Sequence, residues 1–419
     1  MSLWRAVYSI LLHLLIPFAL LRLVWRSRAQ PAYLHHIPER FGSYSSTVPG
    51  PVIWLHAVSV GETRAAEPLV KALRERWPDH RVLLTHMTPT GRETGEQAFG
   101  DGVSRCYLPY DLPWAVARFL SHFRPRLGLL LETELWPNLI HACHARSIPL
   151  YLVNARLSER SARGYARFAG FTRTTLRALA GVAAQTEADA QRLTALGAPQ
   201  VTVCGNLKFD RSPRPQDLEL GERFRTWFGE RLVFVAASTR EDEEEKVLAA
   251  VQLSAQPGLL TVIVPRHPQR FDAVARLLAE RELAYQRRSE GNPVAASTAV
   301  FLGDSMGELY AYYAACDLAF VGGSLLPLGG QNLLEACAVG KPALVGPHTF
   351  NFEEATRLAV DAGAALQVRD ERELGRVLAE LLADRERRTR MGQAGLALMG
   401  QHQGAAQRIV ALLQPASRR

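Results

Sequence analysis

A glycine-rich loop late in the chain has the residue types of a nucleotide site. An apolar run ends in Gly322-Gly-Ser324, glycines recur at Gly329 and Gly330, and Glu335 falls in the first turns of the helix expected to follow. Backbone N–H groups of such a loop can approach a phosphate, and Glu335 could accept hydrogen bonds from ribose hydroxyls. Glycines after a strand serve tight packing about as often as they serve ligands, so the loop alone identifies neither base nor reaction.

The position of this loop in the chain restricts the class of nucleotide-binding protein. Dehydrogenases place their glycine turn near the start of a Rossmann unit, and the sequence contains no Walker pattern ending in Gly-Lys-Ser/Thr. A late site is more typical of a transferase that uses a nucleotide sugar. Residues elsewhere must therefore supply the reaction.

Polar loops follow several other predicted strands, at the ends where wound α/β folds bind ligands. In the first half of the chain these loops are Ser59–Glu62, Thr88–Gly91, Glu132–Asn138, Asn154–Ser158 and Gly205–Asp210. In the second half they are Pro265–Pro268 and Gly303–Glu308, in addition to the glycine-rich loop. If two sheets face each other, their carboxyl edges meet around one cleft, and we expect the chemistry there.

Two series of buried strands alternating with helices should position these loops. Continuous apolar runs such as Val52–Ala57 are typical of parallel strands buried on both faces. In the first series we predict strands at 52–57, 81–85, 126–132, 149–154, 181–185 and 201–205, and helices at 62–77, 112–123 and 187–196. In the second we predict strands at 232–237, 259–265, 299–302, 318–322 and 342–345, and terminal helices at 374–382 and 395–413. This alternation predicts an α/β protein with two Rossmann-like, doubly wound domains.

Prolines in the stretch Arg211–Asp217 mark a linker between the two series. We therefore expect an N-terminal segment at 1–28, a first domain at 29–212 and a second domain at 213–419, whose last helix could cross back to the first.

The acidic run Glu241–Glu245 falls where a helix should begin. Charge complementing the helix dipole explains this run better than metal binding does.

The N-terminal segment is predicted to be a membrane anchor. The stretch Ala6–Leu21 is apolar except for Tyr8, Ser9, His13 and Pro17. It is somewhat shorter than the about 20 residues of a full span, and no small-residue cleavage site follows it. Arginines and aromatic residues after it suit anionic headgroups and predict that the rest of the chain is cytoplasmic. The segment could span the membrane or lie on it, and an ordinary buried helix is the alternative.

Composition agrees with a two-domain protein that meets an anionic partner. A chain of 419 residues, 47% of them hydrophobic, can bury large cores. The net charge of +8 suits nucleic acid, a membrane or a phosphorylated substrate, and the lack of RNP, zinc-finger or helix-turn-helix signatures argues against nucleic acid.

Five widely spaced cysteines indicate a reduced, cytosolic protein. His141 and His144 flank Cys143 without a further ligand cluster, which predicts a helix surface and no metal.

A series of motifs along the chain resembles those of the 3-deoxy-D-manno-octulosonic acid (Kdo) transferases of lipopolysaccharide assembly. In the first half these are His56–Glu62, Met87–Gly91, Leu108–Asp111, Glu132–Asn138, Asn154–Ser158 and Asn206–Asp210. In the second half they are Val264–Pro268, Gly322–Ser324 and Gly346–Phe352. The motifs keep their order and approximate spacing, and the resemblance covers essentially the whole chain, including the N-terminal segment.

The resemblance implies a GT-B fold and an inverting transfer of Kdo from CMP-Kdo to a lipid A precursor, lipid IVA. It implies no cofactor and no required metal, and a location on the cytoplasmic face of the inner membrane. Contacts to CMP are implied for Pro265, Arg266, Met306, Gly307, Glu308, Asn332, Leu333, Leu334 and Glu335. Transition-state roles are implied for Glu132 and Lys208.

Three of these residues also have a plainer interpretation. Taken alone, Met306 would more often pack in a core, and Lys208 would be a solvated loop lysine. Glu132 could instead orient Arg156 or Lys208. Two positions depart from many relatives, which have His in place of Gln331 and Pro in place of Leu333.

Glu62 is the residue we expect to act as general base. Inverting transfer is a single displacement, and the weakly acidic acceptor hydroxyl needs a positioned base as it attacks. Glu62 follows a strand and a Ser-Val-Gly turn in the domain nearer the anchor, and hence nearer the lipid acceptor. Departing CMP develops negative charge, so Lys208 and Arg266 should line the site. Without the family resemblance, a glutamate here could simply favour the helix N-terminus.

Two other functions are consistent with the residues alone. One is a GT-B glycosyltransferase that uses a UDP-sugar on a lipid acceptor, because the glycine loop and carboxylate do not specify the base. The other is a membrane-attached nucleotide-binding module without catalysis.

Overall fold

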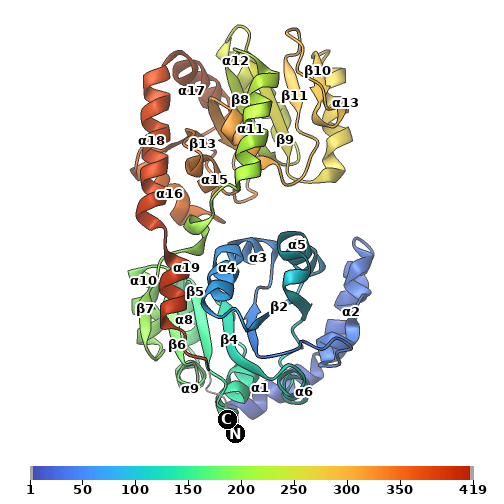
Figure 1. Ribbon diagram of the computed structural model, residues 1–419, viewed down its shortest axis with the longest axis vertical. Coiled ribbons are helices and arrows are strands. Elements are labelled where there is room, and N and C mark those ends of the chain that lie inside the picture. The colour runs from blue at the N-terminus through green and yellow to red at the C-terminus, as the bar shows by residue number, and fades with distance from the viewer. Residues whose placement is uncertain (1–2, 416–419) are drawn as a thin grey trace. The chain divides into compact units, whose positions relative to one another are not determined.

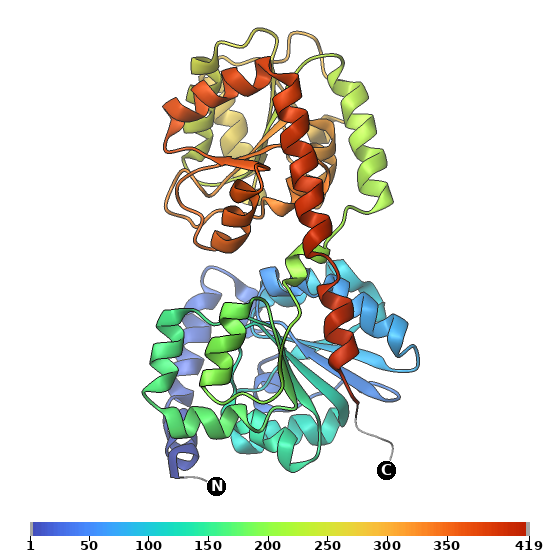
Figure 2. The same cartoon turned by 90° about the vertical axis from the view of Figure 1, so that its left-hand side faces the viewer.

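The computed structural model describes residues 3–415. Its contacts divide the protein into two compact units: one contains the chain up to Asp210 and the residues from Gln403 onward, and the other contains Arg211–His402. The division falls between Asp210 and Arg211 rather than after residue 212. Each unit is a parallel sheet covered by helices, as Figures 1 and 2 show.

The first unit is built on a seven-stranded sheet with the order β3-β2-β1-β4-β5-β6-β7. Its strands are β1 (Val52–His56), β2 (Arg81–His86), β3 (Ser104–Tyr107), β4 (Pro125–Leu131), β5 (Leu150–Ala155), β6 (Gly181–Ala184) and β7 (Val201–Val203). Neighbouring strands of this sheet pair in parallel, with Trp54 of β1 opposite Leu83 on one side and Gly128 on the other. All five residues of β1 are buried, as the apolar run predicts for a central strand.

Helices on both faces connect these strands. They are α3 (Val60–Ala65), α4 (Glu67–Arg76), α5 (Pro89–Phe99), α6 (Pro113–Phe123), α7 (Pro137–Ala145), α8 (Glu159–Ala166), α9 (Ala169–Leu176) and α10 (Glu187–Ala195). The single helix predicted at 62–77 is wrong, because the chain breaks at Ala66 between α3 and α4. Pro68, near the start of α4, has no N–H to continue the hydrogen-bond ladder from α3.

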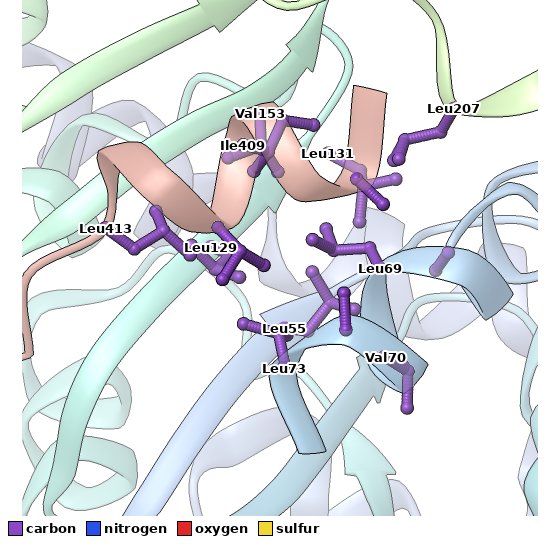
Figure 3. Close-up of a cluster of buried hydrophobic side chains, with 14 of the residues drawn as sticks. Leu55, Leu69, Val70, Leu73, Leu129, Leu131, Val153, Leu207, Ile409 and Leu413 are labelled. Carbon is purple, nitrogen blue, oxygen red and sulfur yellow. The ribbon is translucent and has the colours of Figure 1, made fainter. Parts of the chain in front are cut away.

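The last helix of the chain belongs to the first unit. The helix predicted at 395–413 is in fact two, α18 (Arg385–His402) in the second unit and α19 (Ala405–Leu412) in the first, separated by Gly404 with φ 91°. Asp210 accepts hydrogen bonds from the first N–H groups of α19, including that of Ala406 at 2.6 Å. In Figure 3, Ile409 of α19 lies among apolar side chains of the sheet and of α4.

The second unit also has a seven-stranded parallel sheet, with the order β10-β11-β9-β8-β12-β13-β14. Its strands are β8 (Val233–Thr239), β9 (Leu260–Pro265), β10 (Tyr285–Arg287), β11 (Val300–Leu302), β12 (Leu318–Val321), β13 (Ala343–Val345) and β14 (Ala365–Gln367). Its helices are α11 (Pro215–Phe228), α12 (Glu243–Ser254), α13 (Phe271–Glu280), α14 (Leu309–Ala315), α15 (Leu334–Ala338), α16 (Glu353–Asp361), α17 (Glu371–Ala383) and α18.

The N-terminal segment forms two helices, α1 (Leu3–Leu14) and α2 (Ile16–Ser27), followed by the short turns η1 (Pro31–Leu34) and η2 (Ile37–Phe41). Pro17 lies in the first turn of α2, where its missing N–H does least harm. Among residues 3–415, no single helix is long and apolar enough to cross a membrane. Together α1 and α2 pass the same length and composition criteria, with a bend of 45° between them.

Candidate active-site residues

Glu62 is held by hydrogen bonds where the chain passes from β1 into α3. The hydroxyl of Ser59 caps α3 by accepting a hydrogen bond from the N–H of Glu62 at 3.4 Å. The Glu62 carboxylate accepts from the Val58 N–H at 2.7 Å and from the Ser59 hydroxyl at 3.1 Å. These bonds fix the carboxylate at the carboxyl edge of the sheet.

The surroundings of Glu62 raise the pKa of its carboxyl group. Burial raises the pKa of Glu62 to about 7, and the nearby charges of Glu132 and Glu134 also raise it, against the hydrogen bonds from Val58 and Ser59. A base works best when its pKa lies near the operating pH. If Glu62 served only the helix dipole, that interaction would favour its charged form and lower its pKa.

Glu132 follows β4, the neighbour of β1 in the sheet. Its left-handed backbone, with φ 57°, turns the chain out of the strand. Its Oε2 accepts a hydrogen bond from Nε of Arg156, after β5, at 3.0 Å. Glu132 therefore orients Arg156, one of the interpretations open from the sequence. Two residues on, Glu134 accepts a hydrogen bond from Nε1 of Trp136 at 2.8 Å.

Lys208 lies in the turn η4 (Leu207–Asp210), after the edge strand β7. The loop leading to it runs back over the neighbouring strands, because Asn206 donates to Gln185 after β6 at 2.9 Å and the N–H of Leu207 donates to Asn154 of β5 at 3.0 Å. This path brings Lys208 from the sheet edge toward its centre. The first unit thus gathers Glu62 and Glu132 on neighbouring strands, with Lys208 on a loop that returns toward them.

The glycine-rich loop of the second unit differs from the prediction. The N–H groups of Gly323, Ser324 and Leu325 all donate to the carboxylate of Glu243, the latter two at 2.9 Å. The prediction that these backbone groups are open to a phosphate is therefore wrong for Gly323–Leu325, because a fully buried protein carboxylate occupies them. Gly322 is needed for packing, since a Cβ there would lie 2.7 Å from the carbonyl oxygen of Ser238.

The same contacts change the interpretation of the acidic run Glu241–Glu245. Glu243 does begin α12, as expected for a residue that complements the helix dipole. Its carboxylate, however, mainly binds the glycine loop and also accepts from the N–H of Arg240 at 3.2 Å. The next carboxylate, Glu244, pairs with Arg270 at 2.6 Å.

Asn332, Leu333, Leu334 and Glu335 lead into the short helix α15. The side chains of Leu333 and Leu334 are buried in the core, so only their backbone can face a ligand. Asn332 Oδ1 accepts from the Leu334 N–H at 3.3 Å. Glu335 is 6% exposed, and its Oε1 accepts a hydrogen bond from Nη1 of Arg211 at 2.6 Å.

The turn Met306-Gly307-Glu308 follows β11. Met306 is 49% exposed, so the alternative that it packs in the core is wrong, and Gly307 has φ 80°. Both carboxylate oxygens of Glu308 accept hydrogen bonds from Arg288, at 3.0 and 3.1 Å, and one also accepts from Ser305 at 2.6 Å. The Glu308 side chain therefore holds the turn, while Met306 and the backbone of the turn remain to contact a ligand.

Pro265 is the last residue of β9, the strand next to β11, and Arg266 follows it. The N–H of Arg266 donates to the carbonyl of Thr239, at the end of β8, at 2.9 Å. Pro265 and Arg266 thus lie at the end of β9, and the turn at Met306 follows the adjacent strand β11. The segment ending at Glu335 follows β12, which lies on the other side of β8. All lie at the carboxyl edge of one sheet, where ligands of this fold class bind.

Three residues of these sites were not found from the sequence: Arg211, Glu243 and Arg288. Glu243 lies in the acidic run and Arg211 begins the predicted linker, whereas Arg288 lies in no recognisable pattern. Among residues 3–415, no group of three or more His, Cys, Asp or Glu side chains is arranged to hold a metal ion.

Comparison with known proteins assigns the chain to a class and then to a family. Residues 230–397 match the model for glycosyl transferases group 1. A crystal structure of UDP-GlcNAc 2-epimerase from Neisseria meningitidis bound to UDP-GlcNAc has a TM-score of 0.59 and 17% sequence identity, covering 86% of this chain and 99% of that one. At that identity the likeness concerns the fold alone. Two parallel-sheet α/β units and the group 1 match define a glycosyltransferase with a GT-B-like fold.

The family follows from closer relatives. Residues 35–211 match the model for 3-deoxy-D-manno-octulosonic-acid transferase (kdotransferase). The chain is 44% identical to a 3-deoxy-D-manno-octulosonic acid transferase of Bordetella pertussis, over 98% of this chain and 99% of that protein. It is 40% identical to a protein of the same name from Haemophilus influenzae, over 98% of each. The chain belongs to the Kdo transferase family.

Proposed function

We propose that this protein transfers Kdo from CMP-Kdo to a hydroxyl of a lipid A precursor, lipid IVA, with inversion at the anomeric carbon and with Glu62 as general base. Family membership supports Kdo as the transferred sugar. The observation that carries the mechanism is the Glu62 carboxyl group, which is fixed at a strand end and has a pKa of about 7.

The reaction is a single displacement. The acceptor oxygen attacks the anomeric carbon of Kdo while the Glu62 carboxylate takes the proton of that hydroxyl. The bond between the anomeric carbon and the CMP phosphate oxygen breaks, and CMP leaves with the electron pair. Near neutral pH a large fraction of Glu62 is ionised and able to accept a proton, because its pKa lies close to that pH.

The remaining residues bind the donor and balance charge. In this proposal Lys208 and Arg266 face the negative charge that develops on departing CMP. Glu132 acts through Arg156, to which it is bonded at 3.0 Å. Pro265, the turn at Met306 and the segment ending at Glu335 hold the nucleotide.

We further propose that α1 and α2 lie on the cytoplasmic surface of the inner membrane, where the lipid acceptor resides. Most large apolar side chains of both helices are exposed, among them Leu14 at 71%, Phe18 at 66% and Trp25 at 66%. Soluble surfaces rarely carry such a contiguous apolar patch. Arg22, Arg26 and Arg28 add positive charge beside it, which suits anionic headgroups. Binding to vesicles of anionic phospholipid and extraction at high pH test this location.

Transfer of Kdo from CMP-Kdo to lipid IVA in detergent tests the reaction. We expect the wild type to catalyse transfer and Glu62→Gln to lose at least about a hundredfold in kcat, the usual contribution of a general base. Glu75→Gln, which changes an exposed carboxylate on α4, is the matched control and should keep the wild-type rate. CMP titration should give the same affinity for both variants.

Three results would overturn the proposal. Full activity of Glu62→Gln would exclude this residue as the base. Tighter binding and faster turnover of a UDP-sugar than of CMP-Kdo would show that the donor is a UDP-sugar. Binding of CMP without any transfer would show that the protein is a nucleotide-binding module without catalysis.

A further inference from the structure

Helix α1 contacts the rest of the first unit through polar side chains and through the rings of Trp4 and Tyr8. Ser9 is its one buried residue among those described, and the hydroxyl of Ser9 lies 3.2 Å from Oδ1 of Asn138. The Tyr8 hydroxyl donates to Oδ2 of Asp111 at 3.1 Å, and the Tyr8 ring packs against Phe171 with centroids 5.9 Å apart. A helix whose apolar side chains remain exposed is therefore attached by specific hydrogen bonds.

Asp111 connects α1 to the start of α7. It is 2% exposed and accepts hydrogen bonds from the N–H groups of Asn138 and Leu139, at 2.9 and 2.8 Å. Its carbonyl oxygen also accepts from Nδ2 of Asn138 at 2.7 Å. The residue at the N-cap of α7, Trp136, makes no side-chain capping bond, so Asp111 caps this helix from a different part of the chain.

The start of α7 is also the end of the loop that carries Glu132. The chain leaves β4 at Leu131 and enters α7 at Pro137, so five residues, 132–136, separate the two elements. Inside this loop Glu132 binds Arg156, and Glu134 binds Trp136. A loop this short is fixed by its two ends, and Asp111 fixes one of them. The charges of Glu132 and Glu134 in turn help to raise the pKa of Glu62.

We propose that docked α1 is a structural part of the active site and that Asp111 is the positioning residue that links it to the loop 132–136. The polar atoms of Tyr8 and Ser9 bind Asp111 and Asn138, and this bridge holds Glu132 and Glu134 in place beside Glu62. The inference rests on the proposed role of Glu62 as base. It separates two roles of α1, because its exposed apolar side chains serve the membrane while its polar side chains serve the catalytic loop.

The double variant Tyr8→Phe with Ser9→Ala tests this role, since it removes the bridging polar atoms and leaves the exposed apolar residues of α1 unchanged. With detergent-dispersed lipid IVA, where membrane attachment is not required, we expect kcat to fall at least about fivefold. KM for CMP-Kdo and binding to anionic vesicles should stay within twofold of the wild type. A shift of the loop carboxylates away from Glu62 should also lower the apparent pKa of kcat/KM, which a merely structural role would not do.

Tyr44→Phe with Ser254→Ala is the matched control. Tyr44 donates to the carbonyl of Tyr107 at 3.2 Å, and Ser254 donates to that of Val251 at 2.7 Å, so the control loses similar bonds away from α7. It should keep the wild-type kcat and pH profile. Melting temperatures of all variants establish that the tested proteins are folded.

Wild-type kcat and pH profile in the Tyr8→Phe, Ser9→Ala variant would overturn the inference, as would an equal loss of kcat in the control. Assaying Glu62→Gln in parallel separates this failure from failure of the proposed function. If Glu62→Gln is inactive and the double variant is fully active, only the bridge is wrong. If Glu62→Gln is fully active, Glu62 is not the general base, and the hydrogen bonds of Tyr8 and Ser9 do not position a catalytic base. Both proposals then fail.

Discussion

Nη1 of Arg211 lies 2.6 Å from Oε1 of Glu335, and both side chains are largely buried, at 16% and 7% exposure. Arg211 is the first residue of the second unit, three positions after Lys208. The ion pair therefore connects the residue proposed to bind ribose with the first residue of the second unit. A donor that contacts Glu335 would therefore be linked to Arg211, where the chain enters the second unit.

Replacing Arg211 should affect both stability and nucleotide binding. Arg211→Met leaves the Glu335 carboxylate without its cation, and removal of one partner of a buried ion pair costs about 3 kcal/mol. We expect a lower melting temperature and CMP affinity reduced about tenfold. Arg357→Met, which breaks a pair with Asp361 in which both side chains are more than 60% exposed, should change neither measurement detectably. Unaltered CMP affinity in Arg211→Met would show that the pair does not shape the nucleotide site.

Glu243 should be essential for the stability of the second unit. Glu243→Gln replaces a carboxylate that receives three loop N–H groups with an amide whose NH2 group opposes some of them. Hydrogen bonds to a charged group contribute about 1.5–3 kcal/mol each, so we expect a loss of about 3 kcal/mol in the free energy of unfolding, measured in denaturant. Glu245→Gln, at a carboxylate that is 57% exposed, is the control and should unfold like the wild type. Equal unfolding midpoints for both variants would contradict the assigned role of Glu243.

The pH dependence of the reaction should report the ionisation of Glu62. The base must be deprotonated, so kcat/KM should rise with pH and level off above the Glu62 pKa of about 7. Glu134→Gln removes a negative charge that disfavours ionisation of Glu62, so the apparent pKa should fall and the variant should keep more of its plateau rate at pH 6. Glu93→Gln, on α5, provides a control with an unchanged profile. An apparent pKa that rises in Glu134→Gln would have the wrong sign for this explanation.

The sequence predicts the central strands of both sheets well because these strands are buried on both faces. Runs such as Val52–His56 and Leu260–Pro265 are rich in apolar residues and buried at every position. The missed strands β3, β10 and β14 all lie at sheet edges and are at most four residues long. Such strands are partly exposed and contain polar residues, so their pattern does not differ from that of a loop.

Candidate site residues that follow a strand can be proposed from the sequence. Residues that form ion pairs with site carboxylates from elsewhere in the chain cannot. Glu62 and Glu132 lie after the strands that the sequence predicts, and their catalytic roles stay predictions. Arg211 and Arg288 lie 124 and 20 positions from the carboxylates that they bind, and no local pattern marks such pairs. The glycine loop is the clearest failure, because its geometry suits an anion and the anion is Glu243 of the protein itself.

Arg288 should control nucleotide affinity through the turn at Met306. Its guanidinium binds both oxygens of Glu308 and lies 5.2 Å from the ring centroid of Phe224 and 5.5 Å from that of Trp227. A lysine cannot form the two parallel bonds, so Arg288→Lys should loosen the turn even though it keeps the charge. We expect CMP affinity to fall about tenfold in calorimetric titration, with kcat at saturating CMP-Kdo within about threefold of the wild type. Arg281→Lys, whose partner Glu245 is exposed, should bind CMP as the wild type does. If Arg288→Lys binds CMP normally but loses kcat, the turn serves the chemical step rather than donor binding.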